Sequence, residues 1–203
     1  MRLRLSSEPA HRRRQLAALL ALVFFLVAGV ALSAFGGSQA SDDVSVNPQQ
    51  SSSREIEQVE IVRVVDGDTV VVERLDGSEE KVRLIGIDAP ESVASDESRN
   101  TEEGRIASAY LHELLPARTV VYLEQDVSDR DQYDRLLRYV WLDEPDGALD
   151  HHAAAEVMVN AILVGEGYAR AKSYAPDTAY DKVLRELGKE AAREKRGVSQ
   201  AWS

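Results

Sequence analysis

The chain has 203 residues, with 24 Lys or Arg against 35 Asp or Glu, and it contains no cysteine. The lack of cysteine excludes a disulfide framework, a thiolate metal site and a cysteine nucleophile. Residues 41–203 hold nineteen basic and thirty-four acidic residues, a net charge of −15, which argues against a broad basic surface for binding nucleic acid.

The first residues have the pattern of an export segment. Five arginines and one glutamate occupy residues 1–15, and residues 16–35 carry no charge. Twenty such residues favour a retained membrane anchor over a signal-peptide core of about 7–15 residues, whereas the small residues of Ser38-Gln39-Ala40 indicate a cleavage site near Ala40. In both cases the following domain lies on the extracellular side of the cytoplasmic membrane, either anchored or secreted.

Composition divides the rest of the chain into two parts. Residues 36–56 are rich in Ser, Gln, Asn and Asp and indicate a flexible linker. The remaining residues 57–203 suit one domain with a single core. The leader or anchor therefore covers residues 1–35.

The segment Val64–Glu91 predicts a β-hairpin with charges at its open end. Apolar residues alternate on both sides of the turn signal Asp76-Gly77. Asp68 is then expected opposite Ile85 or Gly86, with Asp88 at a diagonal offset of about 7–8 Å. One hard cation could bridge the two carboxylates, although an Asp-Gly-Asp sequence by itself is more often an ordinary turn.

Arg83 and the segment after it strengthen the functional interpretation. A charge inside an apolar strand is costly without an anionic partner, and Asp88-Ala89-Pro90-Glu91 places two acids where that strand ends. Several charges converging at one place are hard to explain by stability alone.

The remaining pattern predicts further strands and three helices. Thr101 can cap a helix that presents Ile106, Tyr110 and Leu114 on one face and stops before Pro116. Asp150 can cap a second helix that ends at Gly165 or Gly167, and a third runs from near Asp177 to Gly197. Strands are expected over residues 59–65, 69–74, 80–87, 119–124 and 136–142. From pattern alone the fold class is α+β.

Three motifs in order carry a family resemblance. The first is the Val64–Glu91 hairpin, and the second is Asp131-Gln132-Tyr133-Asp134-Arg135 at the start of an apolar strand. The third runs from Val159-Asn160 through Gly167-Tyr168-Ala169 to Lys172, Tyr174 and Pro176. Over residues 57–203 the chain resembles the staphylococcal nuclease-like, or thermonuclease, family of calcium-dependent phosphodiesterases. The resemblance implies a small five-stranded OB-fold-like β-barrel with three packed helices.

The resemblance also implies residue roles. Asp68, Asp88 and the backbone carbonyl of Ala89 would ligate Ca²⁺, with Asp66 behind them. Glu91 would hold or deprotonate the attacking water, and Arg83 and Arg135 would grip the phosphate and stabilise its growing charge. Tyr133, Lys172 and Tyr174 would contact the substrate, although either tyrosine could equally be a packed residue.

Two positions depart from the family. Lys172 stands where tyrosine is frequent, and Asp134 replaces a glycine before the second arginine. An aspartate there must adopt an unusual backbone conformation beside an anionic ligand. The adjacent His151-His152 is interpreted as part of a helix start, without zinc, and residues 144–155 look like an insertion.

Two functions of different class follow. The first is an exported, monomeric, calcium-dependent nuclease that cuts DNA and RNA, preferably single-stranded or denatured, and leaves 3′-phosphate ends. The second is a catalytically silent OB-fold module that binds nucleic acid at the cell surface. The combined presence of Asp68, Arg83, Asp88, Glu91 and Arg135 favours the enzyme, because a binding module needs no base beside a cation site.

Overall fold

A computed structural model of the chain describes residues 55–93, 97–145 and 151–202. These residues belong to one compact unit. The expected leader, nearly all of the linker and the expected helix cap Asp150 lie outside the described residues. Within the described ranges, no helix has both the length and the apolar character needed to cross a bilayer.

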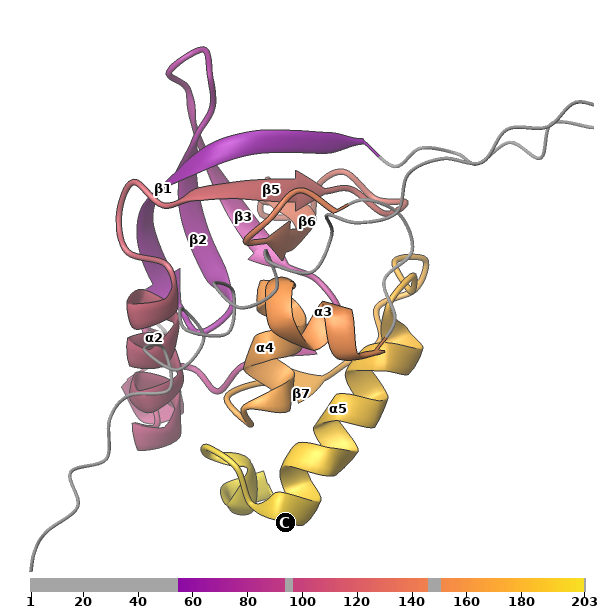
Figure 1. The fold of residues 1–203 in the computed structure, drawn as a ribbon. Helices are drawn as coiled ribbons and strands as arrows, with labels where there is room; N and C mark the ends of the chain where they lie inside the picture. The colour runs from indigo at the N-terminus through magenta and orange to yellow at the C-terminus, as the bar shows by residue number, and fades with distance from the viewer. Residues whose placement is uncertain (1–54, 94–96, 146–150, 203) are drawn as a thin grey trace, which may run out of the picture. The chain divides into compact units, whose positions relative to one another are not determined.

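Five strands close into a barrel (Figure 1). Around the barrel they follow the order β1, β2, β3, β6, β5, and β3 and β6 run parallel while the other neighbours are antiparallel. The strands are β1 (Ile56–Asp66), β2 (Thr69–Glu73), β3 (Glu79–Leu84), β5 (Val120–Glu124) and β6 (Leu136–Trp141). The predicted OB-fold-like α+β architecture is confirmed.

Alternation of apolar residues explains why the β2–β3 hairpin covers the core. One face of each strand points inward and is fully buried, as the period of two requires. Its buried side chains are those of Val70, Val72, Val82 and Leu84. At the tip, Gly77 has a φ of 82°, and the carboxylate of Asp76 accepts the Ser78 amide at 2.9 Å.

Strand β3 ends earlier than the sequence pattern predicts. Thr69 pairs with Arg83, so Asp68 lies beside Leu84 rather than opposite Ile85 or Gly86. Gly86 then takes a φ of 76°, which favours glycine, and turns the chain out of the barrel. The next strand, β4 (Ile87–Asp88), pairs with β7 (Arg170–Ala171) in a separate two-stranded sheet. The expected strand over residues 80–87 is therefore two strands.

Helix α2 (Glu102–Leu114) packs against β1. The predicted cap is confirmed, because Thr101 Oγ1 accepts the Gly104 amide at 3.0 Å. The buried face differs from the expected one: Gly104, Ala107 and Leu111 are covered, whereas Ile106 is 42% exposed. Small residues on this face let the helix approach the Pro90–Glu91 backbone and the turn at Gly67 closely.

The expected second helix is divided into α3 (His151–Val157) and α4 (Val159–Gly165). Between them Met158 is extended, with φ −90° and ψ 116°, and forms a β-bridge with Trp141. Pairing with the end of β6 therefore interrupts the helix, and the described part of the chain has four α-helices instead of three. The side chains of His151 and His152 and residues 146–150 of the expected insertion lie outside the described residues.

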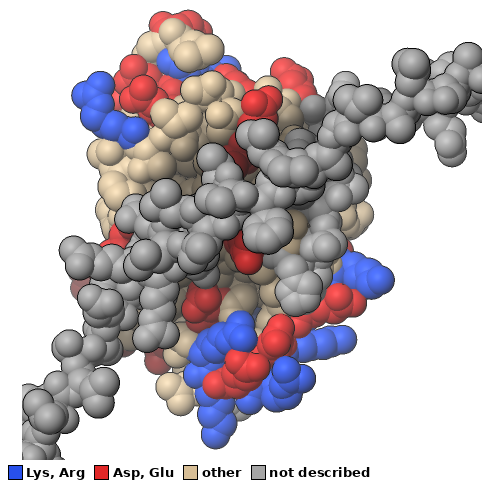
Figure 2. All heavy atoms as spheres, in the orientation of Figure 1, with Lys and Arg blue, Asp and Glu red and all other residues tan. Residues whose placement is uncertain are grey.

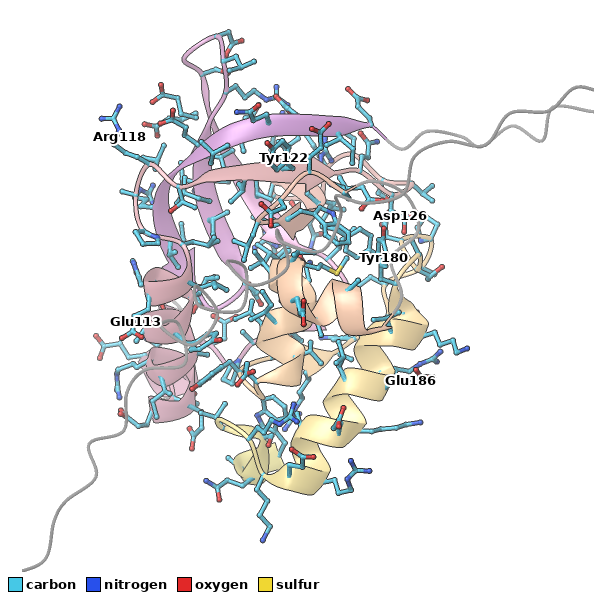
Figure 3. All side chains as sticks on the ribbon, in the orientation of Figure 1. Glu113, Arg118, Tyr122, Asp126, Tyr180 and Glu186 are labelled. Atoms are coloured by element: carbon cyan, nitrogen blue, oxygen red, sulfur yellow. The ribbon has the colours of Figure 1, made fainter. Side chains whose placement is uncertain are left out.

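Helix α5 (Asp181–Glu194) begins four residues later than expected. Asp177 does not cap it; its carboxylate accepts the amides of Val127 and Ser128 at 3.0 and 2.7 Å. At the start of α5, Tyr180 lies edge-on against Tyr139, with ring centroids 4.7 Å apart (Figure 3). The helix ends at Lys195, with a φ of 55°, before the expected Gly197. The described ranges also contain two short 3₁₀ helices, Glu97–Arg99 and Ser199–Trp202.

Candidate active site

The charged residues of the hairpin meet at one end of β3. Arg83 Nη2 lies 3.1 Å from Asp68 Oδ2 and 3.8 Å from Asp88 Oδ1. The same guanidinium donates to the carbonyl oxygens of Leu84 at 2.6 Å and Ile87 at 3.0 Å. Arg83 is therefore held on several sides, and the two carboxylates face a common centre.

Asp68 occupies the more buried position of the two. Its Oδ2 accepts the Ala89 amide at 3.2 Å, and its Oδ1 accepts the Thr69 hydroxyl at 3.0 Å. Burial raises the pKa of Asp68, and the Arg83 charge and these hydrogen bonds offset that effect only in part. Because burial disfavours the ionised carboxylate, a further cation nearby would stabilise it.

A cleft of about 680 Å³ opens over these residues, a size typical of ligand sites. It brings together most of the residues that the sequence singled out. Its lining includes Asp66, Asp68, Arg83, Asp88, Glu91, Tyr133, Arg135 and Tyr174. Ala89 lines a neighbouring hollow of about 300 Å³, to which Asp88 also contributes.

Asp66 joins the β1–β2 turn to the segment that follows Glu91. Its Oδ1 accepts the Gly67 amide at 2.8 Å and the Ser92 hydroxyl at 2.5 Å. Gly67 in turn lies close to Ala89, because a Cβ on Gly67 would come 2.8 Å from the Ala89 Cβ. Asp66 thus stabilises the turn that carries Asp68.

The beginning of α2 positions Glu91. The Glu91 carbonyl oxygen accepts the Thr101 amide at 3.0 Å. A Cβ on Gly104 would come 2.0 Å from that same carbonyl oxygen. The close approach of backbone to backbone therefore sets where the Glu91 side chain enters the cleft.

Arg135 reaches the cleft from the turn before β6 and is oriented by Asp131. Asp131 Oδ2 lies 2.7 Å from Arg135 Nε and 2.6 Å from Nη2. Asp131 Oδ1 accepts the backbone amides of Tyr133 and Arg135 at 2.9 and 3.0 Å. Burial acts to raise the pKa of Asp131, but the hydrogen bonds from Arg135 and the Tyr133 amide, together with the Arg135 charge, outweigh it and lower the pKa.

The turn that carries Arg135 has an unusual backbone. Asp134, which replaces the family's glycine, adopts a φ of 63°. The guanidinium of Arg135 lies 5.4 Å from the ring centroid of Tyr133, and Tyr133 is 71% exposed. Tyr133 is therefore an accessible cleft residue and is not packed into the core.

Asp88 also contacts Lys172 and Tyr174, which follow strand β7. Lys172 Nζ lies 3.2 Å from Asp88 Oδ2 and 5.1 Å from the Tyr174 ring centroid. The Tyr174 hydroxyl lies 3.4 Å from Asp88 Oδ1. Tyr174 and Asp88 raise the pKa of Lys172, so the ammonium stays charged. Lys172 thus pairs with a carboxylate that the sequence assigned to calcium.

Known proteins resemble this chain in sequence over most of its length. Residues 81–202 match the family described as Staphylococcal nuclease homologue. A thermonuclease of Staphylococcus intermedius is 35% identical over 153 residues, which cover 74% of this chain and 82% of that protein. A micrococcal nuclease of Shigella flexneri is 35% identical over 146 residues, covering 71% and 72%. The chain belongs to the staphylococcal nuclease family. A second thermonuclease, from Staphylococcus hyicus, is 34% identical over 143 residues, covering 70% of this chain and 74% of that relative.

In this staphylococcal nuclease homologue, the sequence pattern did not predict three residues that position parts of the cleft. Asp131 orients Arg135, Asp177 anchors the segment before Asp131, and Asn160 is buried between β6 and the β3–β4 turn. The sequence contains a signal for Asp131, because aspartate side chains often accept the backbone amide two residues later and so form a turn. Asn160 gives a second signal, because it is polar within an apolar helical pattern.

The donor set limits which cation this nuclease homologue can hold. Among the described residues, no group of three or more His, Cys, Asp or Glu side chains is arranged for a metal ion. Asp68 and Asp88 share one nitrogen of Arg83, and Asp68 carries a burial cost that a cation would offset. Two carboxylates supplemented by a carbonyl and water fit a hard, weakly bound ion such as Ca²⁺.

Proposed function

We propose that this member of the staphylococcal nuclease family is a calcium-dependent nuclease that hydrolyses DNA and RNA with little sequence specificity. The observation that carries the proposal is the shared position of Asp68 and Asp88 around Arg83, in one cleft with Glu91 and Arg135. A cation site, a candidate base and two planar cationic groups are what phosphodiester hydrolysis requires.

Each of these groups has a chemical task. Asp68, Asp88 and the Ala89 carbonyl would hold the ion. Bound calcium supplies positive charge that neutralises the scissile phosphate and orients the attacking water. Glu91 holds that water or accepts its proton, while Arg83 and Arg135 donate to phosphate oxygens as charge grows on them. Water attacks phosphorus, the bond to O5′ breaks, and the departing oxygen takes up a proton, which leaves a 3′-phosphate and a 5′-hydroxyl.

Tyr133, Lys172 and Tyr174 are assigned to the substrate. Tyr133 offers an exposed ring on which a base can stack, and its place beside Arg135 suits a single strand better than a rigid duplex. The Tyr174 hydroxyl and the Lys172 ammonium both lie at Asp88 and can meet a phosphate next to the ion.

The acidic surface is the main physical argument against a polyanionic substrate. Figure 2 shows acidic and basic side chains interspersed on one face, with basic groups gathered towards the end of α5. At physiological salt, surface charge is screened within about 8 Å. Within the cleft, Lys81, Arg83 and Arg135 offset part of the charge of six carboxylates, and the proposed cation would add positive charge beside the phosphate. The overall charge therefore acts mainly on the association rate.

We further propose that the domain works on the extracellular side of the cytoplasmic membrane. It would be anchored there by residues 16–35 or secreted after cleavage near Ala40. A site with two carboxylates should bind calcium in the range of about 10⁻⁴–10⁻³ M, which external calcium can fill. Calcium use and export thus support each other.

The competing function is a catalytically silent module that binds nucleic acid at the cell surface. An OB-fold-like barrel with exposed aromatic and cationic groups would suit that function. The presence of Glu91 in the same cleft as Asp68 and Asp88 favours the enzyme, since binding alone gives a base no task.

A calcium-dependent digestion assay separates the two functions. A soluble protein from Glu55 onward should shorten denatured DNA and RNA in millimolar calcium and stop when a chelator is added. Equal digestion in chelator would contradict the role of the cation. Binding of DNA without any shortening would favour the silent module.

A further inference from the structure

The turn that carries Tyr133 and Arg135 is closed by contacts on two sides. Arg130 and Leu136 form the β-bridge at its base, and the Asp134 amide donates to the Asp131 carbonyl at 3.0 Å. On the cleft side, Asp131 accepts the amides of Tyr133 and Arg135. These contacts define the turn and attach its base to β6 through Leu136, but none of them reaches β3.

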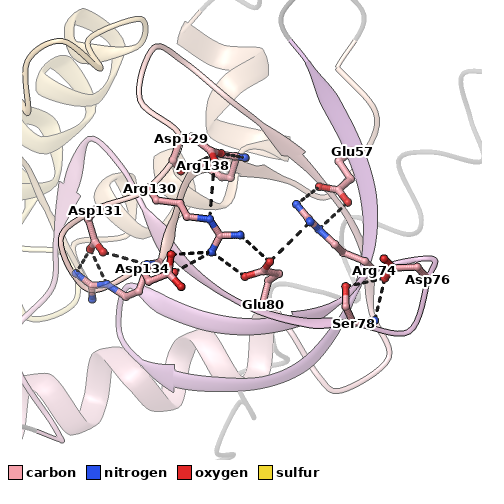
Figure 4. Close-up of polar contacts among 11 residues, drawn as sticks. Glu57, Arg74, Asp76, Ser78, Glu80, Asp129, Arg130, Asp131, Asp134 and Arg138 are labelled. Atoms are coloured by element: carbon pink, nitrogen blue, oxygen red, sulfur yellow. Dashed lines mark hydrogen bonds and ion pairs between the residues drawn. The ribbon is translucent and has the colours of Figure 1, made fainter.

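Arg130 connects the turn to β3. Its Nη2 lies 2.7 Å from Glu80 Oε1 and its Nη1 lies 3.0 Å from Glu80 Oε2, so the pair is bidentate (Figure 4). Glu80 belongs to β3. The hydrogen bonds from Arg130 lower the pKa of Glu80, which keeps the carboxylate charged. Side chains of both residues are mostly covered, at 30% and 20% exposure, so the pair is partly protected from solvent.

The same guanidinium also contacts Asp134 in two ways. Arg130 Nη1 donates to the Asp134 carbonyl oxygen at 2.9 Å and lies 3.5 Å from the Asp134 carboxylate. The first contact fixes the peptide group between Asp134 and Arg135. The second places a positive charge beside the Asp134 carboxylate, which is 88% exposed and directly precedes Arg135 in the chain.

Asp134 creates the need for both contacts. Its φ of 63° lies in the left-handed region, which costs a residue other than glycine free energy unless the surroundings hold it. Its carboxylate is attached to the residue directly before Arg135, so its charge opposes an anionic substrate at that arginine.

We infer that Arg130 is a positioning residue for the phosphodiester substrate: it fastens the 131–135 turn to β3 through Glu80 and neutralises Asp134, so that Arg135 and Tyr133 can meet the nucleic acid. This inference rests on the proposed nuclease function. Arg130 itself does not touch the reacting atoms; it acts through the turn.

The chain offers a matched control on the same surface. Arg74 also pairs with Glu80, at 3.7 Å from Oε1, and donates to Glu57 at 3.2 Å (Figure 4). Its side chain pairs with these two glutamates and not with Asp134, so R74M removes one arginine charge and one partner of Glu80 without releasing Asp134.

The kinetic test compares R130M, R74M, D134G and the double variant R130M/D134G on denatured DNA in calcium. R130M should lower kcat/KM about tenfold, the effect of losing one hydrogen bond to a charged group, and part of this loss should appear in kcat because Arg135 acts on the transition state. R74M and D134G should stay within about twofold of the wild type. Because D134G removes both the carboxylate and the backbone cost, the double variant should recover most of the kcat/KM that R130M loses.

Two results would overturn the inference: R130M indistinguishable from R74M, or a double variant as impaired as R130M. A second readout needs neither calcium nor substrate. Amide hydrogen exchange at Tyr133 and Arg135 should become faster in R130M than in R74M. Equal exchange in the two variants also counts against Arg130, whereas absence of any cleavage by the wild type would count against the nuclease function.

Discussion

Asn160 donates its side-chain amide to the carbonyl oxygen of Ile85 at 2.8 Å, although 75 residues separate the two in the sequence. Asn160 also accepts the Val140 amide at 2.9 Å and is fully buried. One side chain on α4 thus joins β6 to the turn between β3 and β4. That turn leads directly to Asp88, so Asn160 helps to hold in place the segment that carries Asp88.

Replacing Asn160 with leucine should destabilise the domain by about 2–5 kcal/mol, because two buried backbone groups lose their hydrogen-bond partners. Urea unfolding followed by circular dichroism measures this change. The control is E113Q on the exposed side of α2 (Figure 3), which should alter stability by less than about 0.5 kcal/mol. A wild-type midpoint for N160L would show that the buried amide is not needed.

Asp68→Asn should increase stability at neutral pH in a chelator. The pKa of Asp68 is raised in the folded protein, chiefly by burial, so ionisation costs the folded state stability as the pH rises through and above the ordinary aspartate range. Asparagine cannot ionise, and its advantage should shrink when the pH falls below about 4. The measurement is urea unfolding across this pH range.

Asp76→Asn should change stability at neutral pH in the opposite direction. Hydrogen bonds from Ser78 lower the pKa of Asp76, so its ionised form contributes stability above its unfolded pKa, and that contribution is lost as the pH falls. D76N should therefore lose stability at neutral pH. If D68N lost stability as well, burial would not be the dominant influence on Asp68.

Gly104→Ala should impair activity through Glu91. The new Cβ would come 2.0 Å from the Glu91 carbonyl oxygen, a backbone atom, so α2 must move away from the segment that carries the proposed base. A fall in kcat larger than the loss of stability explains is expected, measured at saturating DNA. R105A, an exposed neighbour on α2, should retain its kcat. An unchanged kcat in G104A would show that the position of Glu91 does not depend on this close approach.

Arg135→Lys should lower kcat by about 10²–10³, because lysine keeps the charge but loses the planar donor fork. Glu91→Gln and Arg83→Ala should also lose most activity while remaining folded, as circular dichroism can verify. R118A removes a charge on the turn between α2 and β5 (Figure 3) and should leave kcat unchanged. A near-wild-type rate in R135K, E91Q or R83A would remove that residue from the mechanism.

The fold was largely predictable because apolar alternation is local. The period of two along residues 69–84 defined the hairpin, and Thr101 marked the start of α2. The breaks at Gly86 and Met158 were not predictable in this way. Met158 leaves the helix to pair with Trp141, and Gly86 turns where the chain meets Leu184, so both depend on residues distant in the sequence.

The site was predictable only in part for the same reason. Hairpin geometry suffices to bring Asp68 near Arg83, and a charged residue in an apolar strand drew attention to Arg83. Asp88 reaches them only through the turn at Gly86 and the pairing of β4 with β7. Lys172 was expected to meet a phosphate, yet its contact with Asp88 follows from the pairing of β4 with β7. The bidentate ion pair between Arg130 and Glu80 joins residues 50 positions apart, so no local sequence pattern predicts it.

That β4–β7 pairing has a consequence for biosynthesis. Asp88 lies on a two-residue strand whose partner, Arg170–Ala171, is translated more than eighty residues later. We expect a nascent chain to remain unable to cut nucleic acid until β7 and helix α5, which packs against α4, have left the ribosome or the export channel. Stalled chains of increasing length should gain cleavage abruptly once residues up to Glu194 are released, and gradual gain from shorter chains would contradict this order of assembly.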